Sequence, residues 1–207
     1  GLTALHDVAR VRDDAVATSL ADLLLRRGAD ANAVAECCGT PLTVAAERRN
    51  QALIERLLAV PELRVDIPGR AGMTPLGFAA AGGQCALVRE LIERGADPDA
   101  RDARGRTALH LTLEAIWYDQ GSLDTRLEFG ADPDAEDRAG RTTLHLAAAS
   151  GDLKAVDLLL EREAAVDHRD DAGSTPLHVP IDAGFPAVAL RLLQHGGADP
   201  GLADAMG

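Results

Sequence analysis

The feature that most constrains the fold of this 207-residue chain is a threonine-centred motif that returns from one end to the other. Its clearest copy reads GRTTLHLAA over residues 140–148. The related threonines, at intervals of 33 to 37 residues, are Thr3, Thr40, Thr74, Thr107, Thr142 and Thr175. Four units also close with Gly-Ala-Asp, beginning at Gly28, Gly95, Gly130 and Gly197. Such a period predicts a stack of similar units, each packed against its neighbours.

Each unit is predicted to be a turn followed by two helices. Residues 137–140 read Asp-Arg-Ala-Gly, and these residue types favour a tight hairpin-like turn. Thr142 is then expected to cap a first helix, because its hydroxyl can accept a first-turn N–H. Apolar residues at helical spacing over 144–148 and 156–160 predict the two helices. Proline suits the first helical position, where its missing donor costs nothing, and it follows the threonine at Pro41, Pro75 and Pro176.

The chain resembles the ankyrin-repeat family, and the likeness covers essentially all 207 residues through six degenerate copies of the motif. The resemblance implies an all-α repeat protein, an ankyrin-type solenoid of stacked helix-turn-helix units joined by β-hairpin-like turns. We expect a single domain, 1–207, because no linker interrupts the period. The repeats, numbered 1 to 6 below, are placed approximately at 1–34, 35–68, 69–101, 102–136, 137–169 and 170–203, with the start of a seventh turn at 204–207.

Composition narrows the function. With 46% hydrophobic but only 2% aromatic residues, the core is expected to consist of thin layers of Ala, Leu and Val, so no cofactor cavity is predicted. A net charge of −12 opposes nucleic-acid binding, which depends on neutralising phosphates with Lys and Arg. No apolar run approaches the roughly 20 residues that cross a bilayer, and no leader opens the chain, so we expect no membrane partner and a cytoplasmic location. Cys37, Cys38 and Cys85 fit neither a disulfide framework nor a paired metal motif.

The histidines and aspartates argue against catalysis because they follow the repeat. His6, His110, His145 and His178 all stand three residues after the capping threonine, and a catalytic histidine would not need four copies. The resemblance implies instead that each ring hydrogen-bonds across neighbouring turns. Aspartates recur in the loop after the second helix as turn formers. We therefore predict no enzymatic activity, no metal and no cofactor.

Ankyrin-like stacks commonly bind proteins on the surface formed by turn tips and inner helices, so the resemblance places function there. Seven arginines fall on the tips of repeats 3 to 6 of this acidic chain, which predicts a local basic stripe suited to an acidic partner segment. The alternative is that these arginines only solvate the tips. The predicted contacts are Arg70, Met73, Arg101, Arg104, Arg106, Glu114, Arg138, Arg141 and Arg169, together with Trp117 and Tyr118.

Trp117 and Tyr118 are the only Trp and Tyr of the chain, and both stand in a two-residue insertion between the helices of repeat 4. Such side chains are enriched in interface hot spots, where one anchor can contribute about 2 kcal/mol or more. The competing interpretation is that Trp117 fills a gap left by the altered turn.

Three departures from the repeat mark irregular regions. Repeat 1 carries an insertion around 11–14, and repeat 2 replaces its Gly-Ala-Asp closure with residues 61–68. Pro180 falls inside the first helix of repeat 6, where it is expected to bend or shorten that helix. A monomer is expected, but nothing polar closes the last repeat, so self-association through that face stays open as an alternative.

The sequence thus favours a noncatalytic scaffold that binds a partner protein on the concave surface of turn tips and inner helices. Two alternatives stay open at this stage. One is an inhibitor or immunity-type protein that occludes a specific enzyme, and the other is the recruiting domain of a larger enzyme. Neither the partner nor the source organism follows from the sequence, although the composition resembles that of a GC-rich bacterial genome.

Overall fold

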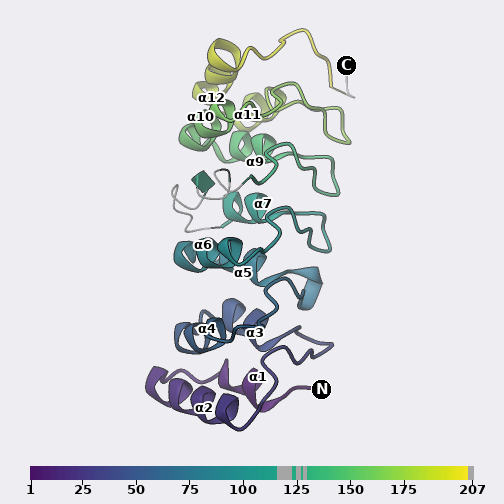
Figure 1. Ribbon diagram of the computed structural model, residues 1–207. Helices are drawn as coiled ribbons and strands as arrows, with labels where there is room; N and C mark the ends of the chain where they lie inside the picture. The colour runs from purple at the N-terminus through teal and green to yellow at the C-terminus, as the bar shows by residue number, and fades with distance from the viewer. Residues whose placement is uncertain (116–122, 125–126, 128–129, 205–207) are drawn as a thin grey trace.

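The chain forms an elongated stack of helix pairs, with the N-terminus at one end and the C-terminus at the other (Figure 1). The computed structural model describes residues 1–115, 123–124, 127 and 130–204. Outer helices line one side, inner helices lie in the middle, and the turn tips project on the opposite side. Within this described part the structure has no strand, only one antiparallel bridge between Ala35 and Gly39. The predicted all-α solenoid is confirmed, while the repeat boundaries remain a prediction.

Inner and outer helices alternate along the chain. The inner helices are α1 (Ala4–Val8), α3 (Pro41–Arg48), α5 (Pro75–Ala81), α7 (Ala108–Leu113), α9 (Thr143–Ser150) and α11 (His178–Ala183). The outer helices are α2 (Asp14–Arg26), α4 (Gln51–Leu58), α6 (Cys85–Glu93), α10 (Leu153–Glu161) and α12 (Pro186–Arg191). Two short segments complete the described elements, the 3-10 turn η1 (Arg70–Gly72) and the π-turn η2 (Leu192–Gly196). No described helix is long and apolar enough to cross a membrane.

The threonine caps lie where the sequence predicted them in repeats 1 to 5, where an extended threonine precedes each inner helix. In repeat 6 the predicted start at Pro176 is wrong, because α11 begins at His178. The turn there closes through the N–H of His178 and the carbonyl of Thr175 at 3.0 Å, and Pro180 has no N–H to donate to the carbonyl of Pro176. The predicted bending or shortening of α11 by Pro180 stays a prediction, because α11 has 6 residues and so does α7, which contains no proline.

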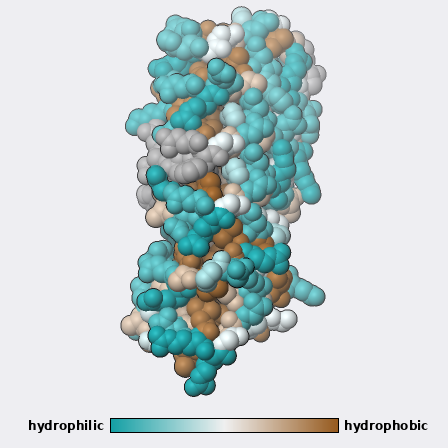
Figure 2. Space-filling view, in the orientation of Figure 1, coloured by the Kyte–Doolittle hydropathy of each residue, from teal (hydrophilic) through white to brown (hydrophobic). Residues whose placement is uncertain are grey.

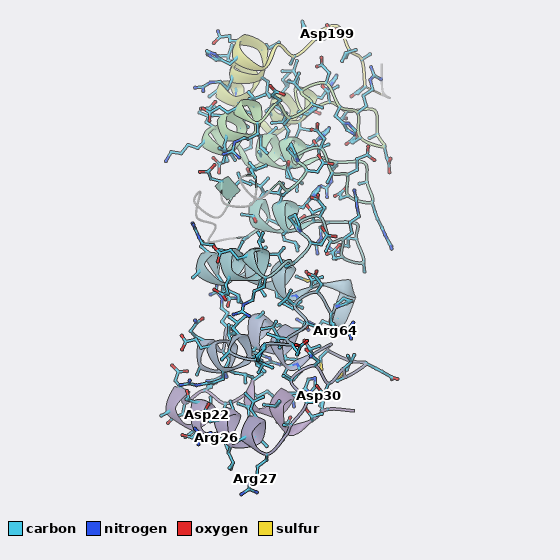
Figure 3. All side chains as sticks on the ribbon, in the orientation of Figure 1. Asp22, Arg26, Arg27, Asp30, Arg64 and Asp199 are labelled. Carbon is cyan, nitrogen blue, oxygen red and sulfur yellow. The ribbon has the colours of Figure 1, made fainter. Side chains whose placement is uncertain are left out.

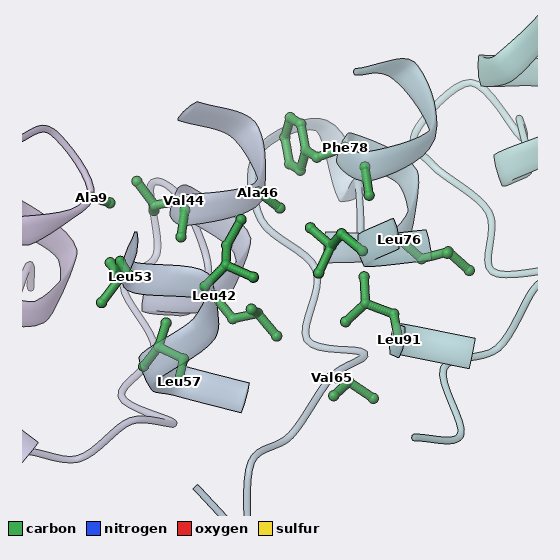
Figure 4. Packing of buried hydrophobic residues seen from close by; sticks show 14 of the residues in the cluster. Ala9, Leu42, Val44, Ala46, Leu53, Leu57, Val65, Leu76, Phe78 and Leu91 are labelled. Carbon is green, nitrogen blue, oxygen red and sulfur yellow. The ribbon is translucent and has the colours of Figure 1, made fainter. Parts of the chain in front are cut away.

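The core consists of aliphatic layers between consecutive repeats. Figure 4 shows one layer, where Leu42, Leu53 and Leu57 of repeat 2 lie beside Leu76 and Leu91 of repeat 3. These side chains are at most 1% exposed, whereas charged residues cover the outside. In the view of Figure 2, hydrophobic residues reach the surface along a seam that follows the stack between hydrophilic flanks. Stability therefore comes from neighbouring repeats, as the aromatic-poor composition predicted.

Buried imidazoles link successive repeats, as the resemblance implied. The Nδ1 atom of His145 lies 3.0 Å from the Thr142 hydroxyl, and its Nε2 atom lies 3.0 Å from the Ser174 carbonyl of the next tip. Because a carbonyl can only accept, Nε2 carries the proton. His6 and His110 make the same link to the carbonyls of Gly39 and Arg141.

A second series of links uses carboxylate and amide oxygens in the loops after the outer helices. Each accepts a hydrogen bond from a backbone N–H of the following repeat, at 2.8 to 3.1 Å. The acceptors are Asn32, Asp66, Asp99, Asp134 and Asp167. The repeated aspartates are therefore structural, which agrees with the prediction that they form turns.

Candidate partner-binding surface

Two adjoining clefts lie between the tips and the inner helices of repeats 3 to 5. The larger, which we call the central groove, has a volume of about 540 Å³ and is lined by Arg49, Met73, Ala81, Gly82, Arg106, Leu111, Glu114 and Ala115. The smaller, the tip cleft, has about 280 Å³ and is lined by Ala103, Arg104, Arg106, Glu114, Asp137, Arg138, Ala139 and Arg141. Together they collect six of the predicted contact residues, from Met73 to Arg141.

Arg106 stands between the two clefts, where carboxylates on both sides hold its guanidinium. Its Nε and Nη2 atoms donate to Asp102 at 2.9 and 2.7 Å, and Nη1 pairs with Glu114. Burial alone would raise the pKa of Asp102, but hydrogen bonds from Arg106 and from the Arg104 N–H hold it below its usual value. Arg106 is therefore a structural residue that also forms a wall of the groove.

Repeat 5 contains the same pair one period later. Arg141 donates to the buried carboxylate of Asp137 at 2.7 and 3.0 Å, and the N–H groups of Ala139 and Arg141 bond the other oxygen of that carboxylate. Desolvation would raise the pKa of Asp137, but these hydrogen bonds lower it. The predicted hairpin-like turn at 137–140 thus closes around its first residue, and Arg141 serves that closure.

Of the other predicted tip arginines, some have a hydrogen-bond or ion-pair partner within the chain and some do not. Arg70 pairs with Glu47 at 2.7 Å, and Arg101 donates to the backbone carbonyls of Gly105 and Glu136. Among the predicted contact arginines, all of which the structure describes, three exposed side chains have no recorded hydrogen bond or ion pair: Arg104, Arg138 and Arg169. The predicted basic stripe is accordingly narrower than the sequence suggested, because most of its guanidinium groups already have a partner within the chain.

The predicted aromatic anchors Trp117 and Tyr118 lie outside the described residues. Their predicted contact with a partner stays a prediction. Glu114 and Ala115, the last residues described before them, line the central groove.

The acidic, histidine and cysteine side chains of the described residues form no metal-binding cluster. Within this part of the chain, no group of three or more of these side chains is arranged to hold a metal ion. The thiols of Cys37 and Cys38 lie 3.1 Å apart, and burial, reinforced by Cys37, raises the pKa of the Cys38 thiol to about 11. A thiol with that pKa stays protonated near neutral pH and is a poor nucleophile.

Arg49 is the charged residue of the central groove that was missing from the predicted contacts. It follows α3 with a left-handed backbone, at φ 57°. Its Nε atom lies where a Cβ at Gly82 would approach it to 3.2 Å, so it reaches toward repeat 3. The sequence contained a signal for this position. Counted from the capping threonine, the residue that matches Arg49 is Gly83 in repeat 3, Gly151 in repeat 5 and Gly184 in repeat 6.

Comparison with known proteins agrees with this architecture. The family model described as "Ankyrin repeats (3 copies)" matches residues 5–102 and 113–204. The matched residues make up most of the chain, and the stack of capped helix pairs is the fold that the match implies. The chain belongs to the ankyrin-repeat family.

The curated relatives that match share segments of the chain only. Ankyrin repeat and KH domain-containing protein mask-1 of Caenorhabditis elegans is 38% identical over 85 residues, which is 40% of this chain and 3% of the relative. YahD of Escherichia coli (strain K12), also named as an ankyrin repeat protein, is 36% identical over 101 residues, 46% of this chain and 50% of the relative. SH3 and multiple ankyrin repeat domains protein 1 of Homo sapiens is 36% identical over 90 residues, 43% of this chain and 4% of the relative. The matches thus cover at most half of these relatives, and none of their names describes a reaction.

Proposed function

We propose that this chain is a noncatalytic scaffold that binds a partner protein along the turn tips and inner helices of repeats 3 to 5. Ankyrin repeats are generally protein-interaction modules. The observation that supports this placement is the central groove, where apolar Met73 and Leu111 line the same cleft as the ion pair of Arg106 and Glu114. Apolar surface flanked by fixed charges is typical of protein-binding clefts.

The charge of the groove margin suggests the character of the partner. Arg104 and Arg138 are exposed beside the tip cleft without a recorded side-chain partner, and Arg49 borders the central groove. An acidic segment would pair with these guanidinium groups without disturbing the internal pairs of Arg106 and Arg141. A cytoplasmic location completes the proposal and is supported by Cys37 and Cys38, whose neighbouring thiols are not joined in a disulfide, since reduced thiols are typical of reducing compartments.

A capture experiment with matched variants tests this proposal. The parent chain, an Arg104→Glu/Arg138→Glu variant and an Arg26→Glu/Arg27→Glu control would be immobilised and exposed to lysate of the source organism. The control carries the same charge change at the N-terminal end of the stack, where Arg26 and Arg27 point away from the groove (Figure 3). Circular dichroism would first establish that all three proteins fold.

The proposal expects a protein that the parent and the control retain and the groove variant loses. If all three proteins retained the partner equally, the partner would not bind at this surface. A Trp117→Ala/Tyr118→Ala variant, run in parallel, tests whether the predicted anchors belong to the same contact.

Self-association is the competing use of the molecule, and exposed apolar residues give it a specific basis. Ile181, Leu190 and Leu193 of repeat 6 are 61%, 53% and 38% exposed, and α2 exposes Val16 and Leu23 at the other end. Sedimentation over a range of concentrations would separate the two. If the protein stays monomeric at all concentrations, these apolar faces do not mediate self-association. If it assembles as the concentration rises, a second copy of the chain is one of its partners.

A further inference from the structure

A second, more enclosed pocket lies between repeats 1 and 2, on the loops that join inner to outer helices. Its volume is about 330 Å³, and it is lined by Ala9, Arg10, Val11, Arg12, Asp14, Arg48, Arg49 and Asn50. Four of these eight residues are arginines in a chain of net charge −12. All four are exposed, so solvent screens their mutual repulsion in part, and an anion bound among them would relieve the remainder.

Asn50 fixes the shape of this pocket. Its buried side chain donates to the carbonyls of Val8 and Val11 at 3.2 and 3.0 Å, and it accepts from the Leu53 N–H at 2.9 Å. One amide therefore joins both loops and caps α4. The arginines consequently stand on a rigid floor, and a ligand would not have to order the loops before binding.

Arg49 shows that the cluster has a structural cost. At φ 57° it occupies the left-handed region, which costs a residue with a Cβ roughly 1 kcal/mol compared with glycine. The corresponding positions of repeats 3, 5 and 6 are Gly83, Gly151 and Gly184, all at positive φ. Repeat 2 thus accepts strain that three sister repeats avoid, and strained backbone of this kind gathers at ligand sites.

The arginines are not required for internal pairing. Arg10 pairs with Asp7 at 3.3 Å, but no ion pair or side-chain hydrogen bond is recorded for Arg12, Arg48 or Arg49 in the described structure. Arg10 and Arg48 lie at the ends of α1 and α3, where a cation favours the helix dipole. That effect does not explain why Arg49 replaces glycine.

Charge and geometry identify the class of ligand. A single carboxylate is satisfied by one bidentate guanidinium. Here the pair with Asp7 and the lining carboxylate of Asp14 offset two of the four guanidinium charges, which leaves two uncompensated. A phosphomonoester carries about −1.5 to −2 charges and three strong acceptor oxygens, so it matches both the charge and the number of donors.

We propose that the pocket between repeats 1 and 2 binds a phosphomonoester group through Arg12 and Arg48, joined by Arg49 when its guanidinium, whose Nε lies toward Gly82 of repeat 3 in this structure, turns into the pocket. The site goes beyond the proposed scaffold function and stands without it, since it lies on different loops and shares only Arg49 with the central groove. If both are correct, a phosphate anchored in the pocket would sit at the end of the groove in which a partner segment lies.

The test is a titration of the full chain with inorganic phosphate near neutral pH, followed through the Nε–H resonances of its arginines by NMR. Saturable shifts confined to the pocket arginines are expected. The key variant is Arg49→Gly, which removes a guanidinium and relieves the left-handed strain, so lost binding cannot be attributed to unfolding. Its affinity for phosphate should fall about tenfold or more, as expected for the loss of a charge-assisted hydrogen-bond pair.

Two controls keep the result specific. Arg27→Ala removes an exposed arginine elsewhere and should leave the affinity unchanged, and so should the Arg104→Glu/Arg138→Glu variant used for the groove. Equal phosphate affinity in the parent and Arg49→Gly, or shifts centred on Arg104 and Arg138, would overturn the proposed site. Because the groove variant is scored by capture of a protein and the pocket variant by phosphate binding, failure of one proposal is distinguishable from failure of the other.

A second titration identifies the source of the phosphate group. The probe is a five-residue peptide of glycines around one phosphoserine, compared with its unphosphorylated form. Binding tighter than that of inorganic phosphate assigns the pocket to a phosphorylated protein segment. Equal binding of both phosphate probes supports a small phosphorylated molecule, and binding of the unphosphorylated peptide as tightly as the phosphopeptide contradicts the proposal.

Discussion

At the tip of repeat 5, the carboxylate of Asp137 holds two backbone N–H groups and the guanidinium of Arg141. The tip of repeat 2 closes through its backbone alone, by paired bonds between Ala35 and Gly39 at 2.7 and 2.8 Å. The same division continues into the helices. Repeat 5 buries His145 where repeat 2 has Thr43, whose hydroxyl donates to the carbonyl of Ile67 at 3.0 Å.

The loops after the inner helices extend the same contrast between the two repeats. Repeat 5 ends α9 with Ser150 and Gly151 and begins α10 with the capping side chain of Asp152. Repeat 2 has Arg48 and Arg49 at the matching positions. Repeat 5 therefore uses its charged side chains to hold its own backbone, whereas repeat 2 leaves charged side chains free at a cost in strain. Residues that the fold does not require are the better candidates for function.

The largest expected effect tests the structural half of this comparison. Asp137→Ala should destabilise the chain by about 2 to 3 kcal/mol, because it removes the acceptor of two backbone N–H groups and the partner of Arg141. Urea unfolding of the parent and the variant measures this loss. Asp171→Ala, at an exposed tip position one repeat further on, is the matched control and should change the free energy of unfolding by less than about 0.5 kcal/mol. Similar losses of unfolding free energy in both variants would show that the hydrogen bonds of Asp137 do not stabilise the tip.

The next effect is a pH dependence that repeat 2 should not share. Burial lowers the pKa values of His110 and His145 below 6.5, so in the folded state both rings stay neutral where the unfolded chain takes up protons. Their contribution to stability is present above the unfolded-state pKa and is lost as the pH falls below it. Stability should thus decrease between about pH 7 and about pH 5.

The chain itself supplies the control for that prediction. A His110→Thr/His145→Thr variant copies the solution that repeat 2 uses at Thr43, with a hydroxyl in place of the ring. Its free energy of unfolding should depend less on pH over the same range than that of the parent. Burial raises the pKa values of Asp66 and Asp99, which titrate in the opposite sense, so the difference between the two proteins is the decisive quantity. Identical slopes would show that the imidazole links do not titrate on unfolding.

Much of the difference between repeats 2 and 5 could be predicted from the sequence, because matching positions of the six repeats can be aligned with one another. The period fixed the positions of the capping threonines and of the histidine links, and both were confirmed in repeats 1, 4 and 5. Pro176 was wrongly placed at the first position of α11, which begins at His178. The local rule for proline at a helix start failed there, because the residues after Thr175 form a turn closed by the His178 N–H, and Pro180 has no N–H for the bond to Pro176 that would extend the helix toward Thr175.

The candidate sites were harder to predict. The sequence predicted that Arg106 and Arg141 belong to a binding stripe. The positions of the arginines in the sequence do not show which carboxylate lies next to each guanidinium in the fold. The pairs with Asp102 and Asp137 span only four residues, and a turn must close before they can form. Conversely, Arg49 was overlooked because a positive φ is a property of the folded backbone, although the glycines of sister repeats at that position were a signal.

A smaller effect of opposite sign tests the other half of the comparison. Arg49→Gly should stabilise the chain by roughly 0.5 to 1 kcal/mol in phosphate-free buffer, because glycine adopts the left-handed backbone without strain. Part of that gain is offset by the greater entropy of a glycine in the unfolded chain. Gly151→Arg, the reverse change in repeat 5, should destabilise, since an added Cβ would meet the ring of Phe185 at 2.6 Å. Thermal unfolding of both variants provides the measurement, and a loss of stability in Arg49→Gly would mean that its guanidinium serves the fold.

The smallest expected difference is the one between two arginines that look alike in sequence. Arg141→Ala should cost about 1 kcal/mol, because it leaves the carboxylate of Asp137 without its charged partner at a tip that is partly exposed. Arg48→Ala should stay within about 0.5 kcal/mol of the parent, since no recorded pair is lost and only the favourable position of a cation at the end of α3 disappears. The two free energies of unfolding would be measured in the same buffer at low and at high salt. High salt should narrow the difference between the two free energies by screening the exposed pair. If Arg48→Ala lost as much stability as Arg141→Ala, Arg48 would also serve the fold, and there would be no reason to expect a ligand between repeats 1 and 2.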